Sequence, residues 1–207
     1  MDIGAGSGML TRPLLDAGAR VLAVEADPAL AARLRRACPA ARVVVADARR
    51  LTWPGEPFRV VANLPFAHGT ELLRALLADP RVPLVAADVI VQWELAVKRT
   101  RVWPSTFQGV LWSAWYELSV VRRIAPAAFA PPPSVAAAVL RATRRPRPLV
   151  DPRHAGAYGS FLQRAYRYGS PHARALAREL GLDPRASARD LDARAWAAVF
   201  ASVRRSL

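Results

Sequence analysis

Short apolar runs that stop at a polar residue recur along the first part of the chain. The runs are residues 20–25, 42–46 and 60–62, and the polar residues that end or follow them are Glu25, Asp47 and Asn63. Helical patterns separate the runs, and strands that alternate with helices form a parallel sheet covered on both faces. The sequence therefore predicts an α/β fold, in which the carboxyl ends of the strands meet at one edge.

Local signals place the helices and the remaining strands. Asp27 and Pro28 form an N-cap and first-turn signal for one helix, and Thr70 is expected to cap another over the leucines that follow it. The other expected strands are residues 84–91, 115–121 and 135–141. The last two are joined by the proline-rich residues 130–134 and are expected to form a closing pair.

A breaker-rich stretch, RRPRP at residues 144–148, marks the expected domain boundary. Residues 1–145 are predicted to form the sheet domain, and residues 146–207 a small basic helical domain. Ser170-Pro171 and Gly181 are expected to start and stop one helix of that domain. Its final helix carries an apolar stripe, interpreted as a core face, of Trp196, Val199, Phe200 and Val203.

The charge of the chain favours a polyanionic partner. Thirty basic residues stand against 16 acidic ones, which gives a net charge of +14. Such a field attracts nucleic acid and disfavours an acidic partner. The candidate phosphate contacts are Lys98, Arg99, Arg101, Arg122, Arg123, Arg144, Arg145 and Arg147.

Other classes of site are not expected. Cys38 is the only cysteine, so an intramolecular disulfide is excluded, and we interpret it as a small buried side chain. The three histidines are scattered without ligand spacing, and no metal site is predicted. Neither a signal peptide nor an apolar membrane span is expected, which favours a cytoplasmic location.

The glycine-rich segment DIGAGSG, residues 2–8, is predicted to turn at the end of the first strand and to open a helix. Met9 stands where a dinucleotide fingerprint requires Gly or Ala, which weakens a dehydrogenase interpretation. Glu25 is placed to accept hydrogen bonds from ribose hydroxyls, and Asp47 from an adenine amine. The expected ligand is an adenine nucleoside.

The tetrapeptide Asn63, Leu64, Pro65 and Phe66 predicts a reader for a planar amino-base. The Asn63 side-chain carbonyl and the Leu64 backbone carbonyl can both accept from an N6 amine, and Phe66 can stack on the ring. Holding the amine with two acceptors localises its nitrogen lone pair, so methyl transfer needs in-line placement and no strong general base.

These motifs resemble the rRNA adenine N6-methyltransferases. The resemblance also covers VLAVEADPAL (21–30), VVVADARRL (43–51), VIVQWELAVKRT (89–100) and AAFAPPPSVAAAVL (127–140). The tryptophan-rich residues 111–126 and the helical tail resemble the erythromycin-resistance (Erm) branch more closely than the small-subunit branch. The fold implied is a class I Rossmann-like methyltransferase sheet with a small C-terminal helical domain.

The resemblance also implies an activity and its partners. S-adenosylmethionine is the implied methyl donor, and Asn63 to Phe66 hold the target adenine. The residues implied to hold the donor are Asp2, Gly4, Gly6, Glu25, Ala26, Asp47, Ala48 and Asn63. The implied substrate is one adenine of 23S rRNA at the macrolide site, in protein-free or early-assembly RNA, and its methylation gives macrolide, lincosamide and streptogramin B resistance. The implied state is a monomer.

The sequence departs from the family pattern at its start. Family members begin upstream of the glycine turn, whereas this chain starts at Met1-Asp2. We expect the chain that starts at Met1 to bind the methyl donor weakly. Restoring the residues upstream of the glycine turn should tighten donor binding.

Two alternatives stay open. A small-subunit 16S rRNA dimethyladenosine transferase would share the chemistry, and a non-catalytic nucleic-acid binder could use the same scaffold. A small-molecule methyltransferase is disfavoured, because a small neutral substrate has no need of the charge.

Overall fold

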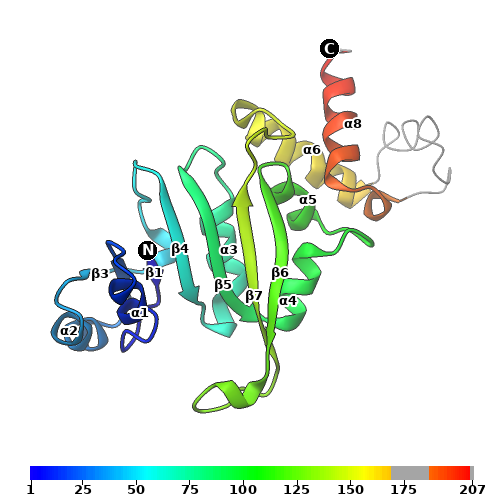
Figure 1. The fold of residues 1–207 in the computed structure, drawn as a ribbon. Coiled ribbons are helices and arrows are strands. Elements are labelled where there is room, and N and C mark those ends of the chain that lie inside the picture. The colour runs from blue at the N-terminus through cyan, green and yellow to red at the C-terminus, as the bar shows by residue number, and fades with distance from the viewer. Residues whose placement is uncertain (169–186, 206–207) are drawn as a thin grey trace. The chain divides into compact units, whose positions relative to one another are not determined.

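The computed structural model describes residues 1–168 and 187–205 and contains a seven-stranded sheet (Figure 1). The strand order is β3-β2-β1-β4-β5-β7-β6. The strands are β1 (Asp2–Ile3), β2 (Leu22–Glu25), β3 (Arg42–Val45), β4 (Phe58–Asn63), β5 (Leu84–Gln92), β6 (Tyr116–Ile124) and β7 (Ala137–Arg144). The predicted α/β class is confirmed.

The sheet is parallel from β3 to β5, and β7 pairs antiparallel with β5. The chain runs outward from β1 to β2 and β3, and then returns to place β4 on the other side of β1. The strand order therefore reverses between β1 and β4. In a parallel sheet a ligand binds at the carboxyl ends of the strands beside such a reversal, and this is where the glycine turn and Asn63 lie.

The helices are α1 (Thr11–Asp16), α2 (Pro28–Ala37), α3 (Gly69–Leu77), α4 (Trp93–Thr100), α5 (Phe107–Ser113), α6 (Ala155–Tyr168) and α8 (Ala193–Arg205). The Asp27 side chain caps α2 by accepting from the backbone N–H groups of Ala29 and Leu30, as predicted. The prediction for Thr70 was wrong: α3 begins one residue earlier, at Gly69, and its N-cap makes no side-chain hydrogen bond. The helix expected between Ser170 and Gly181 lies outside the described residues.

Cys38 belongs to a small apolar cluster beside the glycine turn. It is 2% exposed and packs with Leu34, Val21 and Ala23, and its thiol is free. Gly8 lies against the same cluster with a φ of +89°; a Cβ there would lie 2.8 Å from Leu34 Cδ1 and 3.2 Å from Cys38 Sγ. The turn therefore requires glycine at this position, both for its backbone conformation and for close packing.

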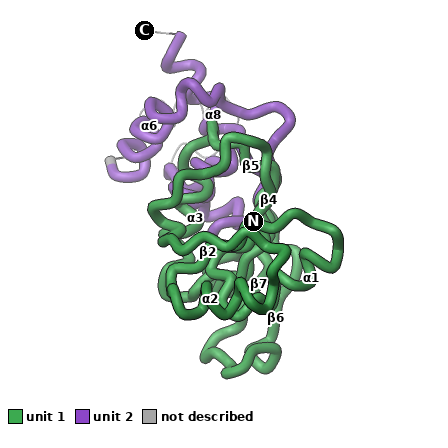
Figure 2. Tube along the Cα trace, turned by 90° about the vertical axis from the view of Figure 1, so that its left-hand side faces the viewer, with its two compact units in different colours: residues 1–96, 119–143 green, residues 97–118, 144–207 purple. Residues whose placement is uncertain are grey.

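The chain divides into two compact units. Unit 1 comprises residues 1–96 and 119–143, and unit 2 comprises residues 97–118 and 144–207, so the chain passes into unit 2, returns, and passes back (Figure 2). The expected boundary after residue 145 lies close to the second passage. A first domain that runs unbroken to residue 145 differs from this division, because α5 packs with α6 and α8.

Buried aromatic side chains form the core of unit 2. Trp112, Trp115, Tyr158 and Trp196 are each at most 1% exposed. Tyr158 makes edge-to-face contacts with Trp115 and with Phe200, at centroid separations of 5.9 and 5.2 Å. The stripe predicted on the final helix is thus a core face at Trp196, Val199 and Phe200.

Candidate functional site

A cavity of about 450 Å³ opens in unit 1 at the carboxyl ends of β1, β2 and β3. Small-molecule sites typically measure about 300 to 1,000 Å³. Its lining residues are Ile3, Gly4, Gly6, Val24, Glu25, Ala26, Leu30, Ala46, Asp47, Ala48, Arg49, Pro65, His68 and Leu72. The structure thus brings together Gly4, Gly6, Glu25, Ala26, Asp47 and Ala48 from the predicted set.

Glu25 ties the glycine turn to the end of β2. Its carboxylate accepts from the Gly6 backbone N–H through Oε2 at 2.8 Å and from the Asp27 N–H through Oε1 at 2.9 Å. The residue is 8% exposed. Each carboxylate oxygen has two acceptor positions, so Glu25 can fix the turn and still accept from a ribose hydroxyl.

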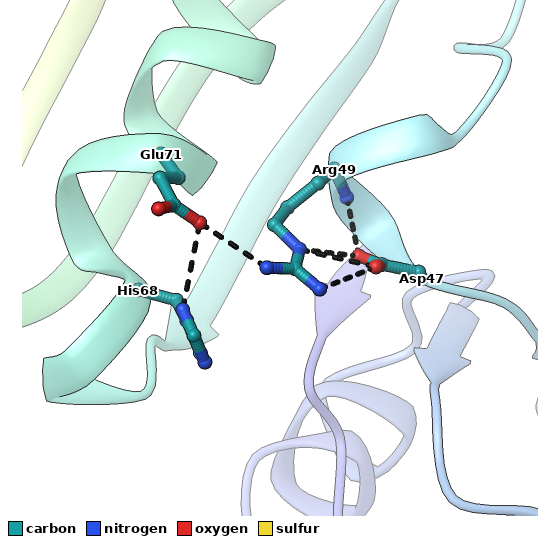
Figure 3. A network of polar contacts seen from close by, with 4 residues as sticks. All are labelled: Asp47, Arg49, His68 and Glu71. Atoms are coloured by element: carbon teal, nitrogen blue, oxygen red, sulfur yellow. Dashed lines mark hydrogen bonds and ion pairs between the residues drawn. The ribbon is translucent and has the colours of Figure 1, made fainter.

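A polar network joins three residues that line the cavity, Asp47, Arg49 and His68, to Glu71 on α3 (Figure 3). Arg49 donates from Nε and Nη2 to the Asp47 carboxylate, with Nη2–Oδ2 at 2.7 Å, and from Nη1 to Glu71 Oε2 at 3.2 Å. His68 Nδ1 lies 3.5 Å from the same Glu71 oxygen. Hydrogen bonds from Arg49 lower the pKa of Asp47 to about 2.

Sequence reasoning missed Arg49, His68 and Glu71. The one available signal was the spacing Asp47-x-Arg49. An aspartate commonly accepts from the backbone N–H two residues later, as Asp47 Oδ1 does from the Arg49 N–H at 2.9 Å, and this turn lets the arginine side chain fold back on the carboxylate. The partnership with Glu71 depends on the placement of α3, which no local pattern gives.

Asp2 and Asn63 do not line the cavity. Asp2 is 1% exposed, and its Oδ2 accepts from Thr11 Oγ1 at 2.6 Å. Burial raises the pKa of the Asp2 carboxyl, with the Thr11 hydrogen bond acting against it. Asp2 therefore connects β1 to α1 beneath the glycine turn, whereas Asn63 is exposed at the end of β4.

The tetrapeptide at the end of β4 borders the cavity through one member. Pro65 lines it, between exposed Asn63 and partly exposed Phe66. Leu64 is 3% exposed, and its N–H donates to Ile90 O at 3.1 Å, which anchors the segment to β5. Phe66 meets Phe129 edge to face at 6.3 Å between centroids, a partner that sequence reasoning did not single out.

The residues predicted to contact phosphate lie in both units and differ in their exposure to solvent. In unit 1, Arg122 and Arg123 are exposed, and the Arg123 guanidinium lies 5.0 Å from the Trp93 ring centroid. In unit 2, Lys98 and Arg101 are exposed, whereas Arg99 is only 8% exposed, with its guanidinium 5.6 Å from the centroid of Trp112.

The two arginines at the expected domain boundary, Arg144 and Arg145, make hydrogen bonds within unit 2. Arg144 donates to the Tyr116 hydroxyl at 3.1 Å, and Arg145 donates to Ser113 O at 2.9 Å and to Glu117 Oε1 at 3.0 Å. These contacts hold Arg144 and Arg145 against the start of β6 and the end of α5, and reduce their freedom to bind a polyanion.

The described residues contain neither a metal-binding cluster nor a membrane-spanning helix. Within residues 1–168 and 187–205, His, Cys, Asp and Glu do not form a group of three or more that could hold a metal ion. No helix in the same ranges has both the length and the apolar character needed to cross a bilayer.

The fold and the cavity define a Rossmann-like methyltransferase scaffold, the class that uses S-adenosylmethionine. The crystal structure of the 23S rRNA methyltransferase ErmE is similar to this chain with a TM-score of 0.81 and 25% identity, over 98% of this chain and 89% of that one. A family described as ribosomal RNA adenine dimethylase matches residues 1–167. The chain belongs to this family.

Relatives from both branches of the family are similar to the chain. The mycinamicin-resistance protein MyrB of Micromonospora griseorubida is 34% identical over 97% of this chain and 68% of its own length. The ribosomal RNA small subunit methyltransferase A of Bordetella bronchiseptica is 34% identical over 87% of this chain and 69% of its own length. The chain spans 52 to 56% of several relatives named rRNA adenine N-6-methyltransferase.

Proposed function

We propose that this chain transfers a methyl group from S-adenosylmethionine to the N6 amine of one adenine in 23S rRNA, and so confers macrolide, lincosamide and streptogramin B resistance. One observation carries the proposal. Pro65 lines the donor cavity, while its neighbours Asn63 and Phe66 present an amide and an aromatic ring at the end of β4. A base reader therefore adjoins a cavity of nucleoside size.

The residues around the cavity suit an adenine nucleoside donor. Glu25 is fixed by two backbone N–H groups and retains acceptor capacity for ribose hydroxyls. Ala26 and Ala48 supply small walls, and Asp47 would accept from the adenine amine. When bound, S-adenosylmethionine supplies a methyl group activated by its sulfonium.

At the target base, the chain needs only to position the adenine and to polarise its N6 amine. The Asn63 amide oxygen and the Leu64 carbonyl accept the two amine protons, and Phe66 stacks on the ring. An amine held this way directs its lone pair out of the ring plane, which fits in-line attack. The base must leave its stack to reach the site, which favours a target in a loop or a flipped nucleotide.

The choice of 23S rRNA is supported by the names of MyrB, a resistance protein, and of ErmE, a 23S rRNA methyltransferase. The small-subunit relative of equal identity supports 16S rRNA as the second candidate. We further propose that the protein acts as a cytoplasmic monomer on protein-free or partly assembled RNA.

Transfer of labelled methyl from S-adenosylmethionine tests the proposal, with protein-free 23S rRNA and partly assembled small subunits offered separately. Label at a single adenine of 23S rRNA is the expected result. Label confined to the small subunit would establish the second candidate. Salt-sensitive RNA binding with no label on either substrate would leave a non-catalytic binder.

A further inference from the structure

Unit 2 contains a second pocket, of about 220 Å³, whose lining is rich in arginine. It lies below the roughly 300 Å³ at which small-molecule sites usually begin, a size that suits a single charged group. The charged residues of its lining are Arg99, Arg101, Glu117, Arg145, Asp192 and Arg194.

The charges of this pocket favour an anion. Four arginines and two carboxylates line it. Both carboxylates are occupied: Glu117 accepts from Arg145 at 3.0 Å, and Asp192 Oδ1 accepts from the Ala195 N–H at 2.8 Å at the start of α8. Within the described residues, Arg101 and Arg194 form no ion pair, and both are exposed. The pocket therefore presents two arginines that a bound anion can recruit.

An exposed tryptophan adjoins the pocket. Trp103 follows the pocket residues Arg101 and Val102 in the chain and is 65% exposed, whereas Trp112, Trp115 and Trp196 are buried. Its Nε1–H donates to Asp190 O at 2.9 Å, and the Ser105 N–H donates to Arg189 O at 2.6 Å, which ties the loop to the residues before α8. The indole is thus held in place with much of its surface in solvent.

We infer that this pocket and Trp103 bind one nucleotide of single-stranded RNA, with a phosphodiester held by Arg101 and Arg194 and the base stacked on Trp103. An aromatic platform beside a basic pocket is how proteins hold single-stranded nucleic acid without reading its sequence. An acidic peptide would use the arginines and leave the ring unused. That this RNA is the methylation substrate rests on the proposed function, whereas the nucleotide site itself does not.

The test measures binding of a fluorescent single-stranded oligouridylate by anisotropy, between about 50 and 200 mM salt. Trp103→Ala should weaken binding about 5- to 150-fold, the range for loss of one stacked base, and Trp103→Phe should retain most of the affinity. The double variant Arg101→Gln/Arg194→Gln should lower the slope of log affinity against log salt by about 0.7, the value for one phosphate contact on a single strand.

Arg164→Gln is the matched control, because Arg164 is an exposed arginine on α6 outside the pocket. Inorganic phosphate and polyaspartate serve as competitors. Equal slopes for the double variant and the control would overturn the site. Competition by free phosphate as strong as by RNA, or polyaspartate binding as tight as RNA with no effect of Trp103→Ala, would also overturn it.

Methyl transfer separates this proposal from the proposed function. The oligouridylate contains no adenine and its binding needs no methyl donor, so the anisotropy result does not depend on methyl transfer. If the chain labels rRNA, Trp103→Ala should raise KM for RNA with kcat retained. If no label is transferred, the binding and slope results still decide the nucleotide site.

Discussion

The Arg49 guanidinium covers the Asp47 carboxylate, with Nη2 2.7 Å from Oδ2. Asp47 lines the cavity and is the acceptor that we assign to the adenine amine of the donor. The same guanidinium reaches Glu71 at 3.2 Å on α3, so two carboxylates share one cation (Figure 3). Donor and guanidinium therefore compete for Asp47.

Arg49→Ala should tighten S-adenosylmethionine binding about two- to fivefold, because the exposed ion pair that it removes is worth little by itself. Titration calorimetry with the full chain measures the effect. Arg50→Ala removes the same charge from the next exposed residue and should have no effect. Weaker binding by Arg49→Ala would mean that Arg49 contacts the donor directly.

Asp2→Asn should change how stability depends on pH. Burial raises the pKa of the Asp2 carboxyl in the folded chain. The folded state then binds the proton more tightly than the unfolded state, so stability falls as pH rises from the ordinary carboxyl pKa of 3.8 through the raised one. Each unit of raised pKa costs about 1.4 kcal/mol above this window.

Urea unfolding of the native chain and of Asp2→Asn at a series of pH values from acid to neutral measures this dependence. The variant should gain stability relative to the native chain as the pH rises. Asp16→Asn, at the exposed end of α1, removes one carboxylate without this burial and is the control. A constant difference between native chain and Asp2→Asn across the series would contradict the expectation.

Asn63→Ala should lower kcat for methyl transfer at least about 100-fold, the usual cost of removing one positioned polar group from a reacting centre. Donor and RNA affinities should stay within about twofold, because the Asn63 side chain is exposed and does not line the donor cavity. Single-turnover labelling separates the two effects. A rise in KM with unchanged kcat would show that Asn63 only binds RNA.

Gly8→Ala should destabilise the chain by more than about 2 kcal/mol, since a left-handed backbone and a close contact act together. The added Cβ would meet Leu34 Cδ1 at 2.8 Å. Gly18→Ala carries a similar φ of +80° with nothing within 4 Å, and should cost about 1 to 2 kcal/mol. Urea unfolding compares the two variants; equal losses would show that packing against Leu34 adds nothing.

The sheet and much of the cavity could be predicted because the relevant signals are local. The runs before Glu25, Asp47 and Asn63 are strands β2, β3 and β4, and parallel pairing brings their ends to one edge. The α2 cap was likewise readable from Asp27 and Pro28. Local signals failed for α3, where Thr70 looked like a cap but the preceding turn already continues into the helix.

The remaining features depend on contacts between distant segments. The charge of Arg99 predicted a surface position, but the residue is 8% exposed beside Trp112, because residues 97–100 at the end of α4 belong to the same compact unit as α5. Arg49 acquires its second partner only through the position of Glu71. The expected domain boundary followed the prolines at 146 and 148, which carry no information about the excursion of residues 97–118.

The passage of residues 97–118 into unit 2 determines when each unit can fold during synthesis. The ribosome delivers α5, with Trp112, some 40 residues before α6 begins at Ala155, and β7, the antiparallel partner of β5, is also made after α5. Neither unit can complete its core from the first 118 residues. A chain that stopped at residue 118 would expose the edge of β5 and the indole of Trp112 to chaperones. Both units must therefore complete their folding late and at almost the same time.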